Sequence, residues 1–173
     1  MVLLRYSTLV FFLFFANSAI LAQENWEIVI SGNNVIAEKN GEITHGDKLR
    51  FILSGKNCEV LEHVFTFYTV ANNPQVENLK SRILTILDNG NEINSEVRFV
   101  FPFMAGHSVW FTMGKYYVED HINFLKNVPS VEVEIVNGDN FTAKDYFDIT
   151  ENKWIIGGVE SALIEAQDKC KQL

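Results

Sequence analysis

Short strand-like runs separated by turn signals constrain the fold of this chain more than any other feature. The run at residues 131–136 (VEVEIV) alternates, which places Val131, Val133 and Ile135 on one face of a strand and two glutamates on the other. Comparable β-branched and aromatic runs recur at intervals of roughly eight to twelve residues, a spacing typical of antiparallel sandwiches and barrels. The other predicted strands are residues 26–30, 35–38, 49–53, 64–70, 82–87, 97–101 (ended by Pro102), 109–113 and 116–118, and the strongest turn signals are at 33–34, 40–41, 88–90 and 137–138.

A helix is predicted at the C-terminus. After Gly157 and Gly158, apolar side chains recur at spacings of three and four and form one stripe along an α-helix over residues 158–172. Because a helix of this length is unstable alone, it must pack on the sheet. Residues 119–126 stay ambiguous between a helical turn and an irregular strand. The predicted fold is therefore mainly β: an antiparallel β-sandwich or partly open barrel with one C-terminal α-helix packed on the sheet.

Residues 1–22 have the composition of a secretory signal peptide. Arg5 provides the positive start, residues 9–15 (LVFFLFF) form a short apolar core, and Ala19 and Ala22 occupy the positions where signal peptidase accepts only small side chains. The alternative, a retained membrane anchor, is disfavoured because polar residues interrupt the apolar run before it reaches the roughly 20 residues that span a bilayer. We therefore expect cleavage after Ala22 and a periplasmic or secreted location.

Cleavage leaves residues 23–173, which we expect to form a single β-rich domain, because no linker, repeat or low-complexity tract divides them. No later segment is long and apolar enough to cross a membrane, so no transmembrane segment is expected after cleavage. The chain has 14 Lys and Arg residues against 22 Asp and Glu residues and a formal charge of −8. It has no basic cluster of the kind that phosphates require, which excludes nucleic acid as a partner.

Two cysteines, Cys58 and Cys170, are the only ones in the chain. In an oxidising compartment an isolated pair is most simply interpreted as one disulfide, which would tie the last helix to an early strand. The alternative is two separate buried thiols. Export favours the disulfide because it supplies the oxidant.

The sequence contains no strong catalytic motif. A Gly-x-Ser-x-Gly elbow, a Gly-rich phosphate loop and a blue-copper ligand set are all absent, so no cofactor, metal or catalytic residue is predicted. Residues 106–121 form the richest local cluster. Within it His107, Glu119 and His121 are alternative donors for a metal-dependent hydrolase, but their spacing does not match the usual ligand patterns. We favour the simpler interpretation, in which the histidines lie on the surface or in loops and Trp110, Phe111 and Tyr117 lie in the core.

The same region is a candidate binding surface. Consecutive aromatic residues on a strand point to opposite faces of the sheet, so some of those between residues 99 and 117 must leave the core. Exposed aromatic side chains are common recognition elements, although single ones also occur on ordinary surfaces. The candidate surface consists of His107, Trp110, Tyr116, Tyr117, Glu119 and His121.

The C-terminal region resembles invasion-associated locus B-type proteins, which are small exported bacterial proteins. The resemblance rests on Phe147 and Ile149 and on the pattern of Gly158, Ala162, Leu163, Ala166 and Cys170 that follows a strand and an Asn-Gly turn. It covers roughly the last forty residues. The family has more cysteines, and this chain has an extra stretch before Gly158. The resemblance implies a periplasmic, non-enzymatic β-sandwich protein whose terminal helix carries a bridged cysteine.

These features favour an exported, non-enzymatic module of a Gram-negative periplasm that binds an unknown small ligand or envelope protein through sheet edges and loops. Two alternatives stay open. One is the metal-dependent hydrolase described above. The other is a subunit of a larger envelope assembly, which would present a long, unpaired, apolar edge strand.

Overall fold

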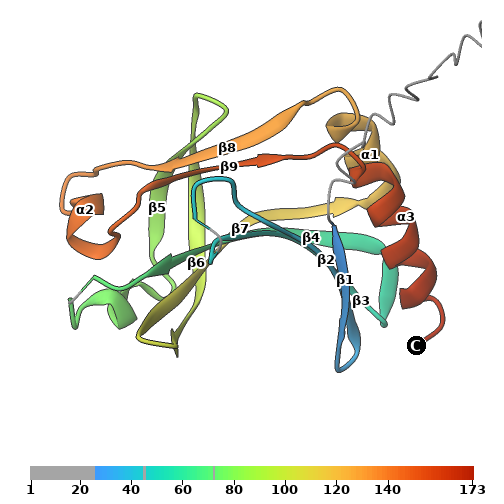
Figure 1. Cartoon of the computed structure of the whole chain (residues 1–173), viewed down its shortest axis with the longest axis horizontal. Coiled ribbons are helices and arrows are strands. Elements are labelled where there is room, and N and C mark those ends of the chain that lie inside the picture. Colours follow the sequence, from blue (N-terminus) through green and yellow to red (C-terminus); the bar gives the residue numbers. More distant parts are fainter. Residues whose placement is uncertain (1–25, 45, 72) are drawn as a thin grey trace, which may run out of the picture.

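The structure, a computed structural model, describes residues 26–44, 46–71 and 73–173 (Figure 1). The predicted signal peptide at residues 1–22 lies outside the described residues. The strands are β1 Glu27–Ser31, β2 Asn34–Asn40, β3 Lys48–Ser54, β4 Asn57–Thr69, β5 Ile83–Asp88, β6 Asn91–Phe103, β7 Gly106–Tyr117, β8 Ser130–Ile135 and β9 Glu151–Ile155. The helices are α1 Val118–Leu125, α2 Ala143–Tyr146, α3 Val159–Cys170 and the 3₁₀ helix η1 Val76–Leu79.

All nine strands belong to one antiparallel sheet in the order β1-β2-β3-β4-β7-β6-β5-β8-β9. The sheet curls into a half-barrel, so that β8 and β9 lie across from β4 and β7 (Figure 1). The ring centroids of Phe67 on β4 and Trp154 on β9 are 6.4 Å apart across the interior. The mainly β fold with a packed C-terminal helix is confirmed, and the partly open barrel is the form that the sheet takes.

The core fills the inner face of this curl. Phe65 and Phe67 on β4 alternate with polar residues and point inward, as does Phe111 on β7, and all three are fully buried. Phe65 and Phe111 stack with ring centroids 4.9 Å apart. Burying an aromatic or large aliphatic side chain contributes about 1.5–3 kcal/mol relative to leaving it exposed, so this aromatic cluster is a main source of stability.

The structure corrects several sequence-based boundaries. Strand β6 does not end before Pro102 but continues to Phe103. Since β5 pairs with β6 only as far as Glu96, β6 is unpaired on that side at Pro102, and a proline is tolerated at such an edge. The predicted strands on either side of Gly114 are one strand, β7, with a bulge there that uses the positive φ of 121°. The ambiguous segment 119–126 is largely helix α1.

Helix α3 is the predicted C-terminal helix. It packs against β1 to β4, and its buried residues Val159, Ala162, Leu163, Ala166 and Cys170 form the expected stripe. Leu173, by contrast, lies beyond the helix and is exposed. Cys170 is bonded to Cys58 on β4, a sequence separation of 112 residues. The disulfide prediction is confirmed.

We expect loss of this disulfide to destabilise the fold strongly. Closure of a loop of this length restricts the unfolded chain and contributes about 4–5 kcal/mol in the chain-entropy treatment. The double variant Cys58→Ser, Cys170→Ser should therefore unfold at a much lower denaturant concentration in equilibrium experiments. Equal midpoints for the variant and the oxidised protein would contradict this expectation. Mass spectrometry of unreduced peptides should show the two cysteines joined.

A buried polar bridge joins the β2–β3 loop to β9, the last strand of the curled sheet. Asp47, in the loop between β2 and β3, is fully buried. Its Oδ1 accepts the backbone N–H of Tyr68 at 2.6 Å, and its Oδ2 accepts the Nδ2 of Asn152 on β9 at 2.7 Å. The Asn152 Oδ1 in turn accepts the backbone N–H of Ile43 at 3.1 Å. Gly41 is required beside this bridge, because a Cβ there would lie 2.4 Å from the Asn152 amide nitrogen.

The buried carboxyl makes stability depend on pH. Burial raises the pKa of Asp47 to about 6, although its two hydrogen bonds oppose the shift and nearby Asp148 reinforces it. Its contribution to stability is therefore complete below the unfolded pKa of 3.8 and is lost as pH rises through about 6. Between pH 4 and 7 the wild type should lose up to about 3 kcal/mol relative to Asp47→Asn, measured by denaturant unfolding. A constant difference between the two proteins across this range would contradict the assignment.

Candidate functional site

The structure separates the residues of the predicted surface. His107 lies at the start of β7, where its Nε2 is 3.6 Å from Glu77 Oε1 of η1. Glu119 and His121 lie on α1, beyond the other end of this 12-residue strand. At about 3.3 Å per residue, His107 and α1 are roughly 30 Å apart, so the three side chains proposed for a hydrolase do not share an ion. Within the described part of the chain, no group of three or more His, Cys, Asp or Glu residues is placed to hold a metal.

His121 is not on the surface, which corrects the simpler interpretation of the sequence. It is 4% exposed and packs in an aromatic cluster with Tyr116 at 4.6 Å and His63 of β4 at 5.1 Å between ring centroids. Tyr117, expected in the core, is 64% exposed. The bulge at Gly114 ends the regular alternation of β7 and explains the wrong assignment of Tyr117, whereas His121 is buried on the inward side of α1.

The two buried histidines are neutral in the folded protein. The Nε2 atoms of His63 and His121 are buried and have no hydrogen-bond partner among the described residues. Burial lowers the pKa of His63 to about 3, with a further contribution from the nearby His121. Burial likewise lowers the pKa of His121 to about 4. A charge on either ring would be poorly solvated, so we assign the pair to packing of α1 on the sheet.

We expect this pair to make the fold sensitive to acid. Both folded pKa values lie below the unfolded value of 6.5, so their contribution to stability is complete above pH 6.5 and is lost as pH falls toward about 4. Each histidine accounts for up to about 1.4 kcal/mol per pH unit. The variant His121→Phe should show a shallower fall in unfolding free energy between pH 6.5 and 4, and His63→Phe, His121→Phe a still shallower one. Parallel curves for the three proteins would sink the assignment.

Trp110 belongs to a different surface, the outer face of the sheet. The outward residues of β6 place Phe99, Phe101 and Phe103 beside Trp110 and Tyr68 of the neighbouring strands. The rings of Phe99 and Phe101 lie 6.0 and 5.9 Å from Trp110, and Phe103 lies 6.1 Å from Tyr68. Phe99 and Phe103 are 45% and 49% exposed. We call these five residues the aromatic strip.

The outer face is uncovered in the described structure. The buried apolar residues of α1, α2 and α3 all belong to the core on the inner face. Next to the aromatic strip the outer face is hollowed into a groove of about 610 Å³, within the range of small-ligand pockets. Apolar side chains from β2, β3, β4, β7 and β6 line the groove. They include Ile36, Ile52, Val60, Val64, Trp110 and Phe99. The polar side chains of Ser31, Asn34, Ser54 and Asn57 also line it.

Charged groups lie along one side of this groove. Arg98 of β6 donates to the carboxylate of Glu62 on β4, which also accepts the hydroxyl of Thr112 at 3.2 Å. Lys115 of β7 lies directly across from Glu62 in the strand register and is exposed. Two cations and one carboxylate therefore line the groove, which gives its lining residues an excess of one positive charge.

A second charged cluster adjoins the aromatic strip. Arg50 Nε donates to Glu38 at 2.8 Å, and Lys48 donates to the same carboxylate. Burial by itself would raise the pKa of Glu38, but the hydrogen bonds and charges of Lys48 and Arg50 outweigh it and lower the pKa. The Arg50 guanidinium lies 4.5 Å above the ring of Trp110. Lys48 also lies 3.9 Å from a carboxylate oxygen of Glu27, so the two cations of this cluster are balanced by two carboxylates. The cluster holds Trp110 in place through Arg50.

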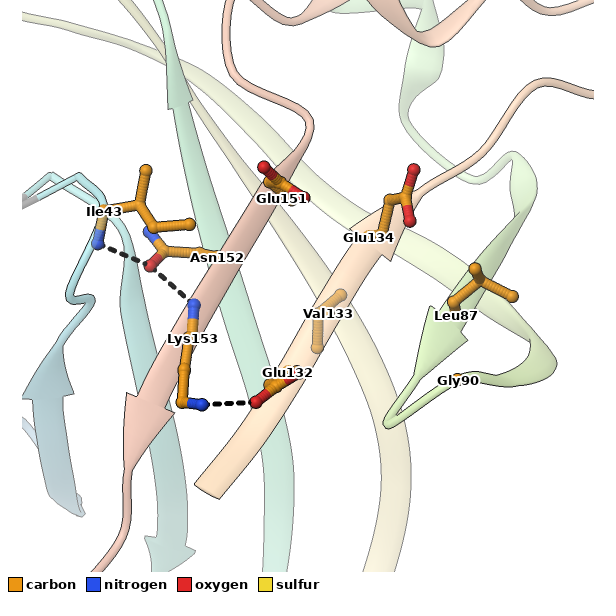
Figure 2. Close-up of a pocket in the computed structure, with 9 residues that line it drawn as sticks. All are labelled: Ile43, Leu87, Gly90, Glu132, Val133, Glu134, Glu151, Asn152 and Lys153. Carbon is orange, nitrogen blue, oxygen red and sulfur yellow. Dashed lines mark hydrogen bonds and ion pairs between the residues drawn. The ribbon is translucent and has the colours of Figure 1, made fainter. Parts of the chain in front are cut away.

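A second hollow of about 370 Å³ lies between β8, β9 and the β5–β6 turn. Figure 2 shows Glu134 and Glu151 pointing the same way from neighbouring strands, while Lys153 pairs with Glu132 at 2.5 Å. The carboxylates that line this hollow are exposed, and Lys153, the cation among its lining residues, is already paired. The outer-face groove is therefore the better candidate, since it combines an apolar floor with excess cationic charge.

Most of the groove was missed by sequence reasoning. Of the candidate surface only Trp110 lines it, while Ile36, Ile52, Arg98 and Lys115 were not singled out. A signal existed in β3, where inward Leu49, Phe51 and Leu53 alternate with outward residues. That alternation identifies an outer face, but only the register of five strands brings its residues together.

Comparison with protein-family models, curated proteins and solved structures finds no match to this chain. The resemblance to invasion-associated locus B-type proteins stays a prediction. Among the described residues, no helix has both the length and the apolar character needed to span a membrane.

Proposed function

We propose that this protein is a non-enzymatic binding module of the bacterial cell envelope and that it binds its ligand on the outer face of the sheet. The observation that carries the proposal is the groove of about 610 Å³, whose apolar floor and excess positive charge lie on a sheet face left uncovered by the described helices. Apolar residues on such a face lower the solubility of the free protein, and a bound ligand would remove them from water.

The proposed location rests on three features. Residues 1–22 have the pattern of an export signal. The Cys58–Cys170 disulfide is of the kind that persists in oxidising compartments such as the periplasm. The C-terminal resemblance to invasion-associated locus B-type proteins points to the same compartment. Periplasmic location after signal cleavage is thus part of the proposal, with an envelope protein or a small ligand as the partner.

A subunit of a larger envelope assembly is the second candidate function, supported by β1. This strand is at the edge of the sheet, and its Val29 and Ile30 are exposed. An unpaired edge is able to add a strand from another chain. The strand has only 5 residues, however, and is short for an assembly interface. The groove is the larger and chemically richer feature.

The proposal is tested by affinity capture from envelope extract with a matched pair of variants. Phe99→Ser removes an aromatic side chain from the groove, whereas Phe124→Ser removes one that is 66% exposed on α1. Retained proteins and small molecules are identified by mass spectrometry. We expect wild type and Phe124→Ser to retain a species that Phe99→Ser loses at least tenfold, since a buried aromatic contact is worth over 1.4 kcal/mol.

Equal retention by all three proteins would contradict the groove as the binding face. Loss on disruption of β1, for example with Val29→Lys, together with full retention by Phe99→Ser, would instead support the assembly subunit.

A further inference from the structure

We infer that the groove takes a long-chain carboxylate, an amphiphile with one unbranched apolar chain and a single negative charge. This inference rests on the proposed function and names the chemical class of its ligand. It follows from the order in which the sheet register places apolar and charged residues across the groove, and from the charge balance at one of its ends.

The register sets apolar and charged residues in sequence across four strands. Ile36 on β2 is opposite Ile52 on β3, Ile52 is opposite Glu62 on β4, and Glu62 is opposite Lys115 on β7. At about 4.8 Å between neighbouring strands, this row spans roughly 14 Å. It is apolar at the β2 end and charged at the β7 end. An extended alkyl chain with one polar head has the same polarity along its length.

The apolar end suits an unbranched chain. Ile36 and Ile52 are only partly buried, so ligand atoms are able to reach them, and Val64 and Trp110 widen the apolar floor beside the row. A groove open along one side admits a narrow chain without rearrangement of the sheet.

The charged end matches a monoanion. Arg98 and Lys115 contribute two positive charges and Glu62 one negative charge, and Arg98 already donates to Glu62. Lys115 is therefore the group left to bind a carboxylate, while Arg98 has further N–H donors. The net charge of these three lining residues is one positive charge, which matches the single negative charge of one carboxylate. A protein with a net charge of −8 would repel anions elsewhere, so this local excess also directs the ligand to the groove.

The test uses quenching of tryptophan fluorescence by a brominated chain. The probe is 11-bromoundecanoate below its micelle-forming concentration, and its control carries the same chain on a trimethylammonium head. Of the three tryptophans, Trp110 lines the groove, Trp154 is fully buried, and Trp26 donates to Gly157 instead. We expect saturable quenching of the wild type by the carboxylate that is lost in Trp110→Phe. The cationic probe should bind at least tenfold more weakly.

Two further measurements separate a built site from general adsorption. Lys115→Gln should weaken carboxylate binding at least threefold, whereas Lys80→Gln, at an exposed lysine outside the groove, should leave it unchanged. Each methylene removed from the chain should weaken binding about fourfold, as expected for burial in an apolar groove. Because Lys115→Gln keeps all three tryptophans and alters an exposed side chain, it tests the inference even if Trp110→Phe folds poorly.

Equal quenching of wild type and Trp110→Phe, equal binding of the two head groups, or equal effects of the two lysine variants would each overturn the inference. Stronger competition by dodecyl phosphate than by laurate would overturn the carboxylate in favour of a phosphate head. If envelope capture depends on Phe99 but the carboxylate does not bind, the proposed binding function is supported and the long-chain carboxylate is contradicted as its ligand. If the carboxylate binds but capture is independent of Phe99, the envelope function falls instead.

Discussion

The whole structure depends on the fact that one curled sheet has one inner face. Nine strands bury their inward residues around a single aromatic core, and the helices add to that same core. The outward residues therefore have no second layer to pack against. In a two-sheet sandwich both sheets share one core and leave two outer faces, whereas here the curl concentrates exposed residues on one continuous surface. The aromatic strip and the groove are consequences of this arrangement.

Two long-range connections stabilise the curled sheet and the position of α3 against it. The buried bridge from Asp47 to Asn152 ties the β2–β3 loop to β9, which is one edge of the sheet. The Cys58–Cys170 disulfide holds α3 against the early strands. Cys58 lies on β4 between Asn57 and Val60, which line the groove, whereas Asp47 and Asn152 do not line it.

The buried polar residues and the charged residues of the groove have different roles. Asp47, His63 and His121 are buried and have shifted pKa values, a property often associated with active sites. Here Asp47 links the β2–β3 loop to β9, and the two histidines pack α1 against the inner face of the sheet. The groups with spare binding capacity, Lys115 and Arg98, lie instead on the outer face. The location of a charged group relative to the core thus says more about its role than its pKa does.

The sequence by itself determined the local features of this protein. Period-two alternation identified most strands, and the spacing of three and four identified α3, because both patterns depend on neighbouring residues. The disulfide was identified because two cysteines allow one pairing. The sequence missed β9, whose residues 151–155 mix polar and apolar types, and it placed His121 on the surface. The groove, by contrast, was determined only by the tertiary structure. Ile36, Ile52, Arg98 and Lys115 come from four strands, and only strand order, register and curl bring them onto one face.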